Sequence, residues 1–267
     1  MNIKVYESDF ISFKGELLSF IFRLVSNRAQ AEDLVHDTYL KAFENIDTFR
    51  EESSFKTWVF AIAHNMSQNV LRKQSRWRED AQQLNARLHI DSQEMFEDMR
   101  AVYVSRPDAN FEIKEHISYC FNCMIKTLEL QQQVCIWLKN VYEFKIHEIV
   151  TITGLSEGKV KHAVADARKH LLRIFDDKCA FVSKTGTCHQ CSSLKGILNP
   201  EQDAQAQANQ LKLVKEGSSA DKERLLDLRV QLVQGIDPLH SSSDHLHSYF
   251  LENSPNWVKM ALSKEKS

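Results

Sequence analysis

Residues 144–171 read FKIHEIVTITGLSEGKVKHAVADARKHL, and this stretch predicts two helices joined by a tight turn. The first helix ends at Gly154, where the missing Cβ atom permits the positive φ of a sharp corner. Ser156 can offer its hydroxyl to the free amides of the second helix. Lys159 stands where a full capping box has Glu or Gln. The pattern is typical of a helix-turn-helix, which places its second helix in the major groove of DNA.

The second helix of this motif carries the residues that we expect to face DNA. Cations near the start of a helix oppose its dipole. A DNA-reading helix accepts that cost because its first residues meet phosphates and base edges. For the basic residues alone, a solvated helix surface is the alternative interpretation. The expected contacts are Ser156, Glu157, Lys159, Lys161, His162, Arg168 and Lys169.

Away from this motif, apolar residues recur at three- and four-residue steps, as they do on amphipathic helices. Helices over about 10–25, 31–46 and 55–71 can bury their stripes against one another as a small bundle. A second helical unit is expected over 115–177. With only 7 Gly and 4 Pro in 267 residues, turn residues are sparse, which favours an all-α fold.

These patterns predict a chain of four parts. The bundle occupies 1–78, and the helix-turn-helix unit occupies 115–177. Between them, 79–114 is polar and interrupted by Pro107, and we expect a linker with one marginal helix. The remaining 178–267 is expected to form a helical extension that contains cysteines.

The composition excludes several classes of protein. Apolar residues make up 43% of the chain and charged residues 26%, so neither a fully disordered chain nor a fibre fits. The net charge of −2 confines nucleic-acid binding to local patches. No apolar run is long enough to cross a bilayer, so we expect no membrane insertion and a cytoplasmic protein. The sequence contains no nucleophile elbow, P-loop or HExxH motif.

The predicted bundle offers two candidate surfaces. Asp33 and Asp37 lie one helical turn apart, with His36 nearby, and they suit a basic partner as well as a plain solvated face. Next come aromatic and basic residues, a mixture that suits single-stranded DNA because bases stack on rings while cations follow the backbone. For Trp58 and Phe55, core packing is the expected role. The candidates for DNA contact are Phe49, Arg50, Lys56, Asn65, Arg72, Lys73 and Arg76.

Three strings in this order resemble bacterial RNA polymerase sigma factors of the extracytoplasmic-function (ECF) branch of the sigma-70 superfamily. They are AEDLVHDTYLKAFENIDTF (31–49), SFKTWVFAIAHN (54–65) and the helix-turn-helix. The resemblance spans roughly 10–175 and implies two small helical domains, named regions 2 and 4. It also implies a non-catalytic subunit that binds core polymerase, recognises a promoter and opens it.

The resemblance assigns a role to each surface. The helix over 31–46 would dock on the polymerase β′ subunit, with β as a further partner, through Asp33, His36, Asp37, Leu40 and Lys41. The loop over 47–56 would capture a base flipped from the minus-ten element, and 67–76 would follow the DNA there. Ser156 to Lys169 would read the minus-thirty-five element. Because His162 and Ala163 replace the small polar residue and Arg of many relatives, the promoter sequence cannot be transferred. An anti-sigma factor is a further possible partner.

The cysteines admit three interpretations. Cys188 and Cys191 form a C-x2-C knuckle with Cys179 upstream, and Cys120 and Cys123 form a second pair. Thiolates at this spacing can bind tetrahedral Zn²⁺. The two pairs together would supply four thiolates, or one histidine would join Cys179, Cys188 and Cys191. The histidines considered are His170, His189, His240, His245 and His247. Redox sensing and simple packing are the alternatives. Some relatives carry Cys-rich extensions, which suggests that this extension gates the DNA-reading unit in cis.

One rival function of another class fits the same motifs. A stand-alone helix-turn-helix regulator could use the first bundle as a sensor or dimerisation module. Such a regulator binds its operator without polymerase, so co-purification with core polymerase separates the two functions. A nucleic-acid enzyme is a more distant rival, because no Glu stands beside a Cys or His metal motif as the zinc deaminases require.

Overall fold

The computed structural model describes residues 3–106, 109–183, 186–198, 209–217 and 219–264. Within these ranges the regular elements are helices, apart from one isolated bridge between Cys179 and Cys188. The all-α prediction is therefore confirmed. The chain divides into two compact units: Met1–Arg76 with Glu129–Ala167, and Trp77–Leu128 with Arg168–Ser267.

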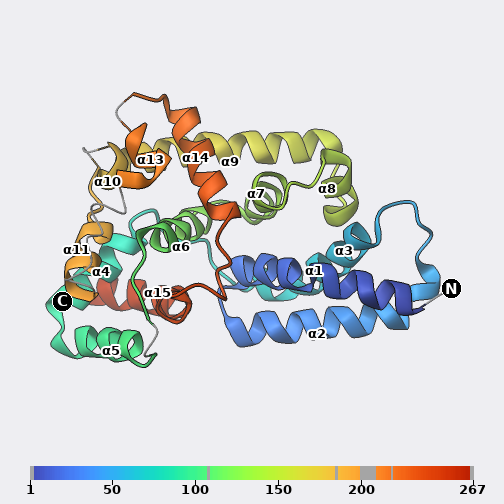
Figure 1. The fold of residues 1–267 in the computed structure, drawn as a ribbon, viewed down its shortest axis with the longest axis horizontal. Helices are drawn as coiled ribbons and strands as arrows, with labels where there is room; N and C mark the ends of the chain where they lie inside the picture. Colours follow the sequence, from blue (N-terminus) through green and yellow to red (C-terminus); the bar gives the residue numbers. More distant parts are fainter. Residues whose placement is uncertain (1–2, 107–108, 184–185, 199–208, 218, 265–267) are drawn as a thin grey trace. The chain divides into compact units, whose positions relative to one another are not determined.

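The first unit begins with a bundle of three helices, α1 (Ile3–Val25), α2 (Arg28–Glu44) and α3 (Phe55–Leu71), which pack against one another (Figure 1). A short 3₁₀ turn, η1 (Ile46–Thr48), follows α2. Side chains cap both later helices: Asn27 accepts from the Gln30 amide, and Ser54 accepts from the Thr57 amide. The predicted bundle is present, and its core contains the fully buried Leu17, Phe20 and Phe60.

The rest of the first unit holds the helix-turn-helix. It comprises α7 (Leu130–Ile136), the π-helical turn η2 (Trp137–Val141), α8 (Ile146–Thr153) and the first half of α9 (Glu157–Lys178). Helix α8 packs on α3 of the bundle. The Phe60 and Phe144 rings lie 4.9 Å apart, and the Tyr142 hydroxyl lies 3.0 Å from that of Ser19. Apart from Arg168 and Lys169, the residues of both predicted DNA-binding surfaces thus belong to one compact body.

The second unit combines the expected linker with the extension. Its helices are α4 (Ala81–Asp91), α5 (Gln93–Val104), α6 (Ile113–Ile125), α10 (Ala180–Ser183), α11 (Gln190–Leu198), α13 (Lys212–Lys215), α14 (Lys222–Gln234) and α15 (Asp244–Lys264), together with the end of α9. Helices α4 and α5 pack against α15, and α14 packs against α6. The segment 79–114 therefore forms two helices with a buried face, which differs from the expected linker with one marginal helix.

The two compact units do not coincide with the four parts expected along the sequence. All of the expected linker and the first helix of the expected helix-turn-helix unit join the extension. The boundary between the two units falls inside α9. None of the helices in the described ranges combines the length and the apolar character that crossing a bilayer requires.

Candidate functional site

Helix α2 presents one acidic face to solvent. Asp33, His36, Asp37, Leu40 and Lys41 are all exposed. The opposite face is buried in the bundle through Ala31, Leu34, Val35, Thr38 and Ala42. Leu40, a large apolar side chain, is 44% exposed among these charges. Single exposed apolar residues are common on protein surfaces, and a docking face would gain from burying this one.

Phe49 lies in an aromatic cluster rather than on the surface. It is 8% exposed, and its ring meets those of Tyr6 at 5.8 Å, Phe55 at 5.7 Å and Trp58 at 5.2 Å. Edge-to-face and tilted contacts of this kind stabilise the loop between α2 and α3. In this conformation the Phe49 ring is not available to stack on a base. Its predicted DNA contact requires the loop to open.

The polar residues predicted to contact the minus-ten element divide into ion-paired side chains and side chains on the surface. Lys56 bonds Glu16 at 2.6 Å and lies 5.0 Å from the Phe144 ring centroid, so it serves the packing of the unit. Arg76 bonds Glu129 at 2.6 Å, although both side chains are exposed. The others lie on the surface: Arg50, Asn65, Arg72 and Lys73.

The turn before α9 has the predicted geometry. Gly154 adopts φ +69°, the left-handed conformation that favours glycine, and closes α8 through a bond to the Val150 carbonyl. The Lys159 amide donates to the Ser156 hydroxyl at 3.4 Å, as expected for a cap. Along α9, Lys161 bonds Glu157 at 2.5 Å. Most of the predicted minus-thirty-five residues are exposed: Ser156, Glu157, Lys159, Lys161, His162 and Lys169.

Arg168 is the exception in this set. Its guanidinium donates to Glu223 at 2.6 Å and to Asp227 at 2.9 Å, both on α14. Two more contacts join α14 to α9: Lys222 bonds Asp176 at 2.7 Å, and the Arg229 guanidinium lies 4.4 Å from the Phe175 ring centroid. These acidic partners lie more than fifty positions from Arg168. The expected helical extension over 178–267 does not single them out.

The first unit also contains a hollow of about 710 Å³. Arg72 and Gln68 of α3 line it from one side, and Lys159 and His162 of α9 line it from the other. His64, a further lining residue, is buried, and burial lowers its pKa to about 4 against a smaller effect of the Ile152 backbone. One predicted minus-ten residue, Arg72, and two predicted minus-thirty-five residues, Lys159 and His162, therefore line the same cavity in this conformation.

Five thiols gather in the second unit. The Cys188 amide donates to the Lys178 carbonyl at 2.7 Å, which pairs the segments that carry Cys179 and Cys188. Gly186 makes that approach possible, since a Cβ there would lie 2.5 Å from Lys178 backbone atoms. Burial and neighbouring thiols hold the pKa of Cys120 and Cys191 far above the ordinary value. Burial also raises the pKa of Cys123 to about 12.

The described part of the chain does not present a preformed metal site. It contains no group of three or more His, Cys, Asp or Glu side chains placed to hold a metal ion. The histidines considered as ligands have other contacts, such as His170 with Thr127 at 2.8 Å and His240 with Asp237 at 2.9 Å. The described thiols Cys120, Cys123, Cys179, Cys188 and Cys191 form no disulfide in this conformation. Thiolates are ligands that zinc prefers, but in this conformation these thiols are not arranged as a zinc site. A metal role for them stays a prediction.

Two family models match the chain. Residues 10–77 match sigma-70 region 2, and residues 118–171 match sigma-70 region 4. The chain is 28% identical over 156 residues to the RNA polymerase sigma factor YlaC of Bacillus subtilis, covering 58% of this chain and 83% of that protein. It is 28% identical over 165 residues to the ECF RNA polymerase sigma factor EcfG of Rhodopseudomonas palustris, covering 61% and 81%.

A solved structure was also matched: the sigma factor RpoE of Bartonella quintana in complex with the anti-sigma factor NepR. The match has 22% identity and a TM-score of 0.46, and it covers 65% of this chain and 98% of that one. Both family models end before residue 172. The last helices of the second unit, α10 to α15, therefore lie outside the matched regions.

Proposed function

This chain belongs to the ECF branch of the sigma-70 family, and we propose how its surfaces divide the work of starting transcription at a promoter. The observation that carries the proposal is the ordered pair of matches, region 2 at 10–77 and region 4 at 118–171, in a chain whose second match contains a capped helix-turn-helix. Polymerase supplies the chemistry, so the chain contributes no catalytic group. It acts where core polymerase and DNA are, in the cytoplasm.

The exposed face of α2 docks on core polymerase. Asp33 and Asp37 supply negative charge for a basic surface of the β′ subunit. Leu40, on the same exposed face, supplies an apolar contact with that subunit. Charge complementarity speeds association and selects the partner, while burial of the apolar side chain slows dissociation. None of these side chains is needed inside the bundle, because the opposite face of α2 packs there.

The end of α3 and the start of α9 contact promoter DNA. The exposed Arg72 and Lys73 follow the backbone near the minus-ten element, and Lys159, Lys161 and His162 enter the major groove at the minus-thirty-five element. Phe49 joins the minus-ten contact when its loop opens and its ring leaves the aromatic cluster. The ring can then regain part of the lost packing by stacking on an unpaired base, at about 1–3 kcal/mol per base.

The described conformation of the first unit is a closed state. The two promoter elements lie about 25 base pairs apart, which at about 3.4 Å per pair is roughly 85 Å. Surfaces that line a common hollow of about 710 Å³ cannot reach both elements at once. Binding to core polymerase must therefore separate α8 and α9 from α3, at the cost of contacts such as that between Phe60 and Phe144. Closure keeps the free subunit from occupying promoters without polymerase.

Transcription in vitro tests the proposal. Core polymerase with the purified chain should produce run-off transcripts from a subset of genomic fragments, whereas core polymerase alone should not. Lys161→Ala should weaken promoter binding and lower the slope of log K against log salt by about 1, because one phosphate contact is lost. Specific DNA binding by the free chain, with no gain in initiation when core polymerase is added, would instead support the stand-alone regulator.

A further inference from the structure

Cys179 and Cys188 lie side by side in the second unit, as partners in the isolated bridge of the described ranges. The Cys188 amide donates to the Lys178 carbonyl at 2.7 Å. Paired extended segments lie about 4.8 Å apart, and the Cα atoms of a disulfide usually lie about 4.4–6.8 Å apart. The backbones of the two cysteines therefore already have the separation that a disulfide needs.

Two features hold these segments in register. Gly186 has no side chain, and a Cβ there would lie 2.5 Å from the Lys178 backbone, so a larger residue would push the segments apart. The Gln83 amide of α4 bonds the residue before each cysteine. It accepts from the Lys178 Nζ at 3.3 Å and donates to the Thr187 hydroxyl at 2.5 Å. One side chain therefore aligns both of the segments that carry the thiols.

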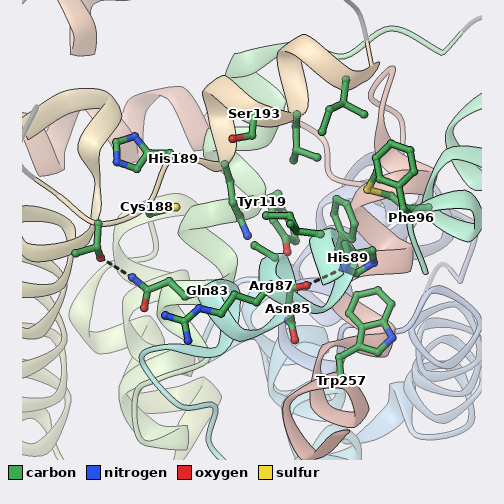
Figure 2. A pocket seen from close by; sticks show the side chains of 18 of the residues that line it. Gln83, Asn85, Arg87, His89, Phe96, Tyr119, Cys188, His189, Ser193 and Trp257 are labelled. Atoms are coloured by element: carbon green, nitrogen blue, oxygen red, sulfur yellow. Dashed lines mark hydrogen bonds between the residues drawn. The ribbon is translucent and has the colours of Figure 1, made fainter. Parts of the chain in front are cut away.

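A small molecule can reach the bridged pair from solvent. Cys188 is half-buried and lines a cavity of about 720 Å³ in the second unit (Figure 2). Ile90 and His189 also line this cavity and are exposed, so the cavity opens to the surface. Cys179 is half-buried as well. Cys188 is thus the thiol that a reagent entering the cavity meets first.

We propose that Cys179 and Cys188 are a thiol–disulfide exchange site for a small disulfide such as oxidised glutathione, with Gln83 as the residue that positions them. The Cys188 thiolate attacks the small disulfide, forms a mixed disulfide and releases one small thiol. Cys179 then attacks the Cys188 sulfur and releases the second small thiol, and each released sulfur takes up the proton that a cysteine loses. Two protein thiols are oxidised to one disulfide while the small disulfide is reduced to two thiols.

The disulfide joins the end of α9 to the segment before α11. Cys179 directly follows Lys178, the last residue of α9, and Cys188 lies two positions before the first residue of α11. A contact that hydrogen bonds make in the reduced chain thus becomes covalent. A mostly reduced glutathione pool breaks the bond again, so this part of the extension is fixed only under oxidising conditions. The inference does not depend on how the chain binds polymerase or DNA.

Equilibration of the full-length chain with mixtures of reduced and oxidised glutathione tests the proposal. Because burial raises the pKa of Cys188, exchange is slow at neutral pH, and the mixtures are held at pH 8 until the oxidised fraction is constant. Unreacted thiols are then alkylated and the chain is digested with trypsin. We expect one disulfide per chain, which joins the peptides CAFVSK (179–184) and TGTCHQCSSLK (185–195). Fragment masses should place it at Cys188 rather than Cys191.

A positioning variant and its control sharpen the test. Gln83→Ala removes both bonds of that amide and should raise the ratio of oxidised to reduced glutathione at half-oxidation about fivefold, the effect of about one hydrogen bond. Gln93→Ala removes another glutamine of the cavity lining, which bonds Glu97 instead, and should leave the midpoint unchanged.

Three results would overturn the proposal. They are no disulfide at any glutathione ratio, a bond between Cys188 and Cys191 in place of the expected one, and one bound zinc ion per purified chain that blocks exchange. Equal midpoints in the wild type, Gln83→Ala and Gln93→Ala would remove the positioning role from Gln83.

Discussion

Gly154 is the residue on which the geometry of the helix-turn-helix depends. Its φ of +69° costs an L-residue about 1–2 kcal/mol, although a Cβ there would meet no atom within 4 Å. We therefore expect Gly154→Ala to lower the free energy of unfolding by about 1 kcal/mol through backbone strain alone. Urea titration followed by circular dichroism measures this change in the free energy of unfolding.

Gly158 supplies the matched control for that variant. It lies in the first turn of α9, where a Cβ also meets nothing within 4 Å and φ is helical. Gly158→Ala should leave the stability equal or raise it by up to about 1 kcal/mol. If Gly154→Ala were as stable as Gly158→Ala, strain at the turn would not be what reserves position 154 for glycine.

The acidic pair on α2 carries the docking proposal. Asp33→Arg with Asp37→Arg reverses two charges on an exposed face and touches no buried side chain, so the fold should persist. We expect core polymerase binding to fall by at least tenfold, because like charges across an interface repel. Biolayer interferometry with immobilised core polymerase measures the affinity.

A second double reversal controls for net charge. Glu94→Arg with Glu97→Arg changes the same number of exposed acidic residues on α5, a helix of the second unit that is not part of the proposed docking face. This variant should bind polymerase like the wild type. Equal losses in the two double variants would assign the effect to overall charge and remove α2 from the proposed interface.

At the scale of elements, helices whose partners are near in sequence could be predicted, and those with distant partners could not. The helices α1, α2 and α3 share wide apolar stripes and pack on one another, so periodicity alone identified them. The helices α4 and α5 bury only narrow faces, such as Leu84, Leu88 and Met99, against α15. Helix α15 lies about 150 positions further along the chain. Because the segment is polar and its apolar stripe is narrow, its sequence pattern indicates a linker.

The candidate site shows the same limit. The exposed acidic face of α2 followed from helical spacing, because a helix that buries one face exposes the other. The states of Phe49, Lys56 and Arg168 did not follow, since each depends on a partner elsewhere in the chain: Tyr6, Glu16 and Glu223. Residue type indicates what a side chain can contact, and only the fold decides which contact it makes.

The contact between α14 and α9 allows the predicted gating of the DNA-reading unit by the extension to be measured. Glu223 and Asp227 occupy the Arg168 guanidinium, so a phosphate must compete with two carboxylates. Glu223→Gln with Asp227→Asn should free Arg168. We expect the holoenzyme to bind a promoter fragment a few-fold more tightly, with a salt slope steeper by about 0.9. Fluorescence anisotropy across a salt series gives both quantities.

A neighbouring ion pair provides the control. Glu216 bonds Arg224 at 2.8 Å within the extension and does not contact Arg168. Glu216→Gln should change neither the affinity nor the salt slope. If the double variant behaved like Glu216→Gln, Arg168 would be a structural residue of the second unit, and the extension would not restrain DNA binding through it.

At the scale of the whole molecule, both units bury neutral histidines. Burial lowers the pKa of His64 in the first unit and of His116 in the second to about 4. It also lowers the pKa of His89 and, together with neighbouring His116 and His245, holds that of His247 well below its ordinary value. Acid therefore acts on both units rather than on one site.

The sign of the pH effect follows from these shifts. Well above pH 6.5 these histidines are neutral in both the folded and the unfolded chain and do not affect stability. As pH falls toward 4, the unfolded chain binds protons that the folded chain excludes, so stability is lost across this window. One pKa unit corresponds to about 1.4 kcal/mol, so the loss amounts to a few kcal/mol. Lys126, whose pKa burial lowers to about 7, acts above this window.

Urea unfolding at pH 7.5, 6.5, 5.5 and 4.8 should therefore show a steady fall in the free energy of unfolding below pH 6.5. His64→Gln removes one of the titrating groups and should flatten that fall, even if the variant starts from a lower stability at pH 7.5, because the slope counts protons and not contacts. Since His64 lines the hollow between α3 and α9, the same acid range should also loosen the closed state of the first unit. Protease cleavage in the 142–156 segment should then rise at pH 5.5 in the wild type more than in His64→Gln. Identical pH slopes in the two proteins would mean that His64 does not titrate on unfolding, and that the closed state is insensitive to its charge.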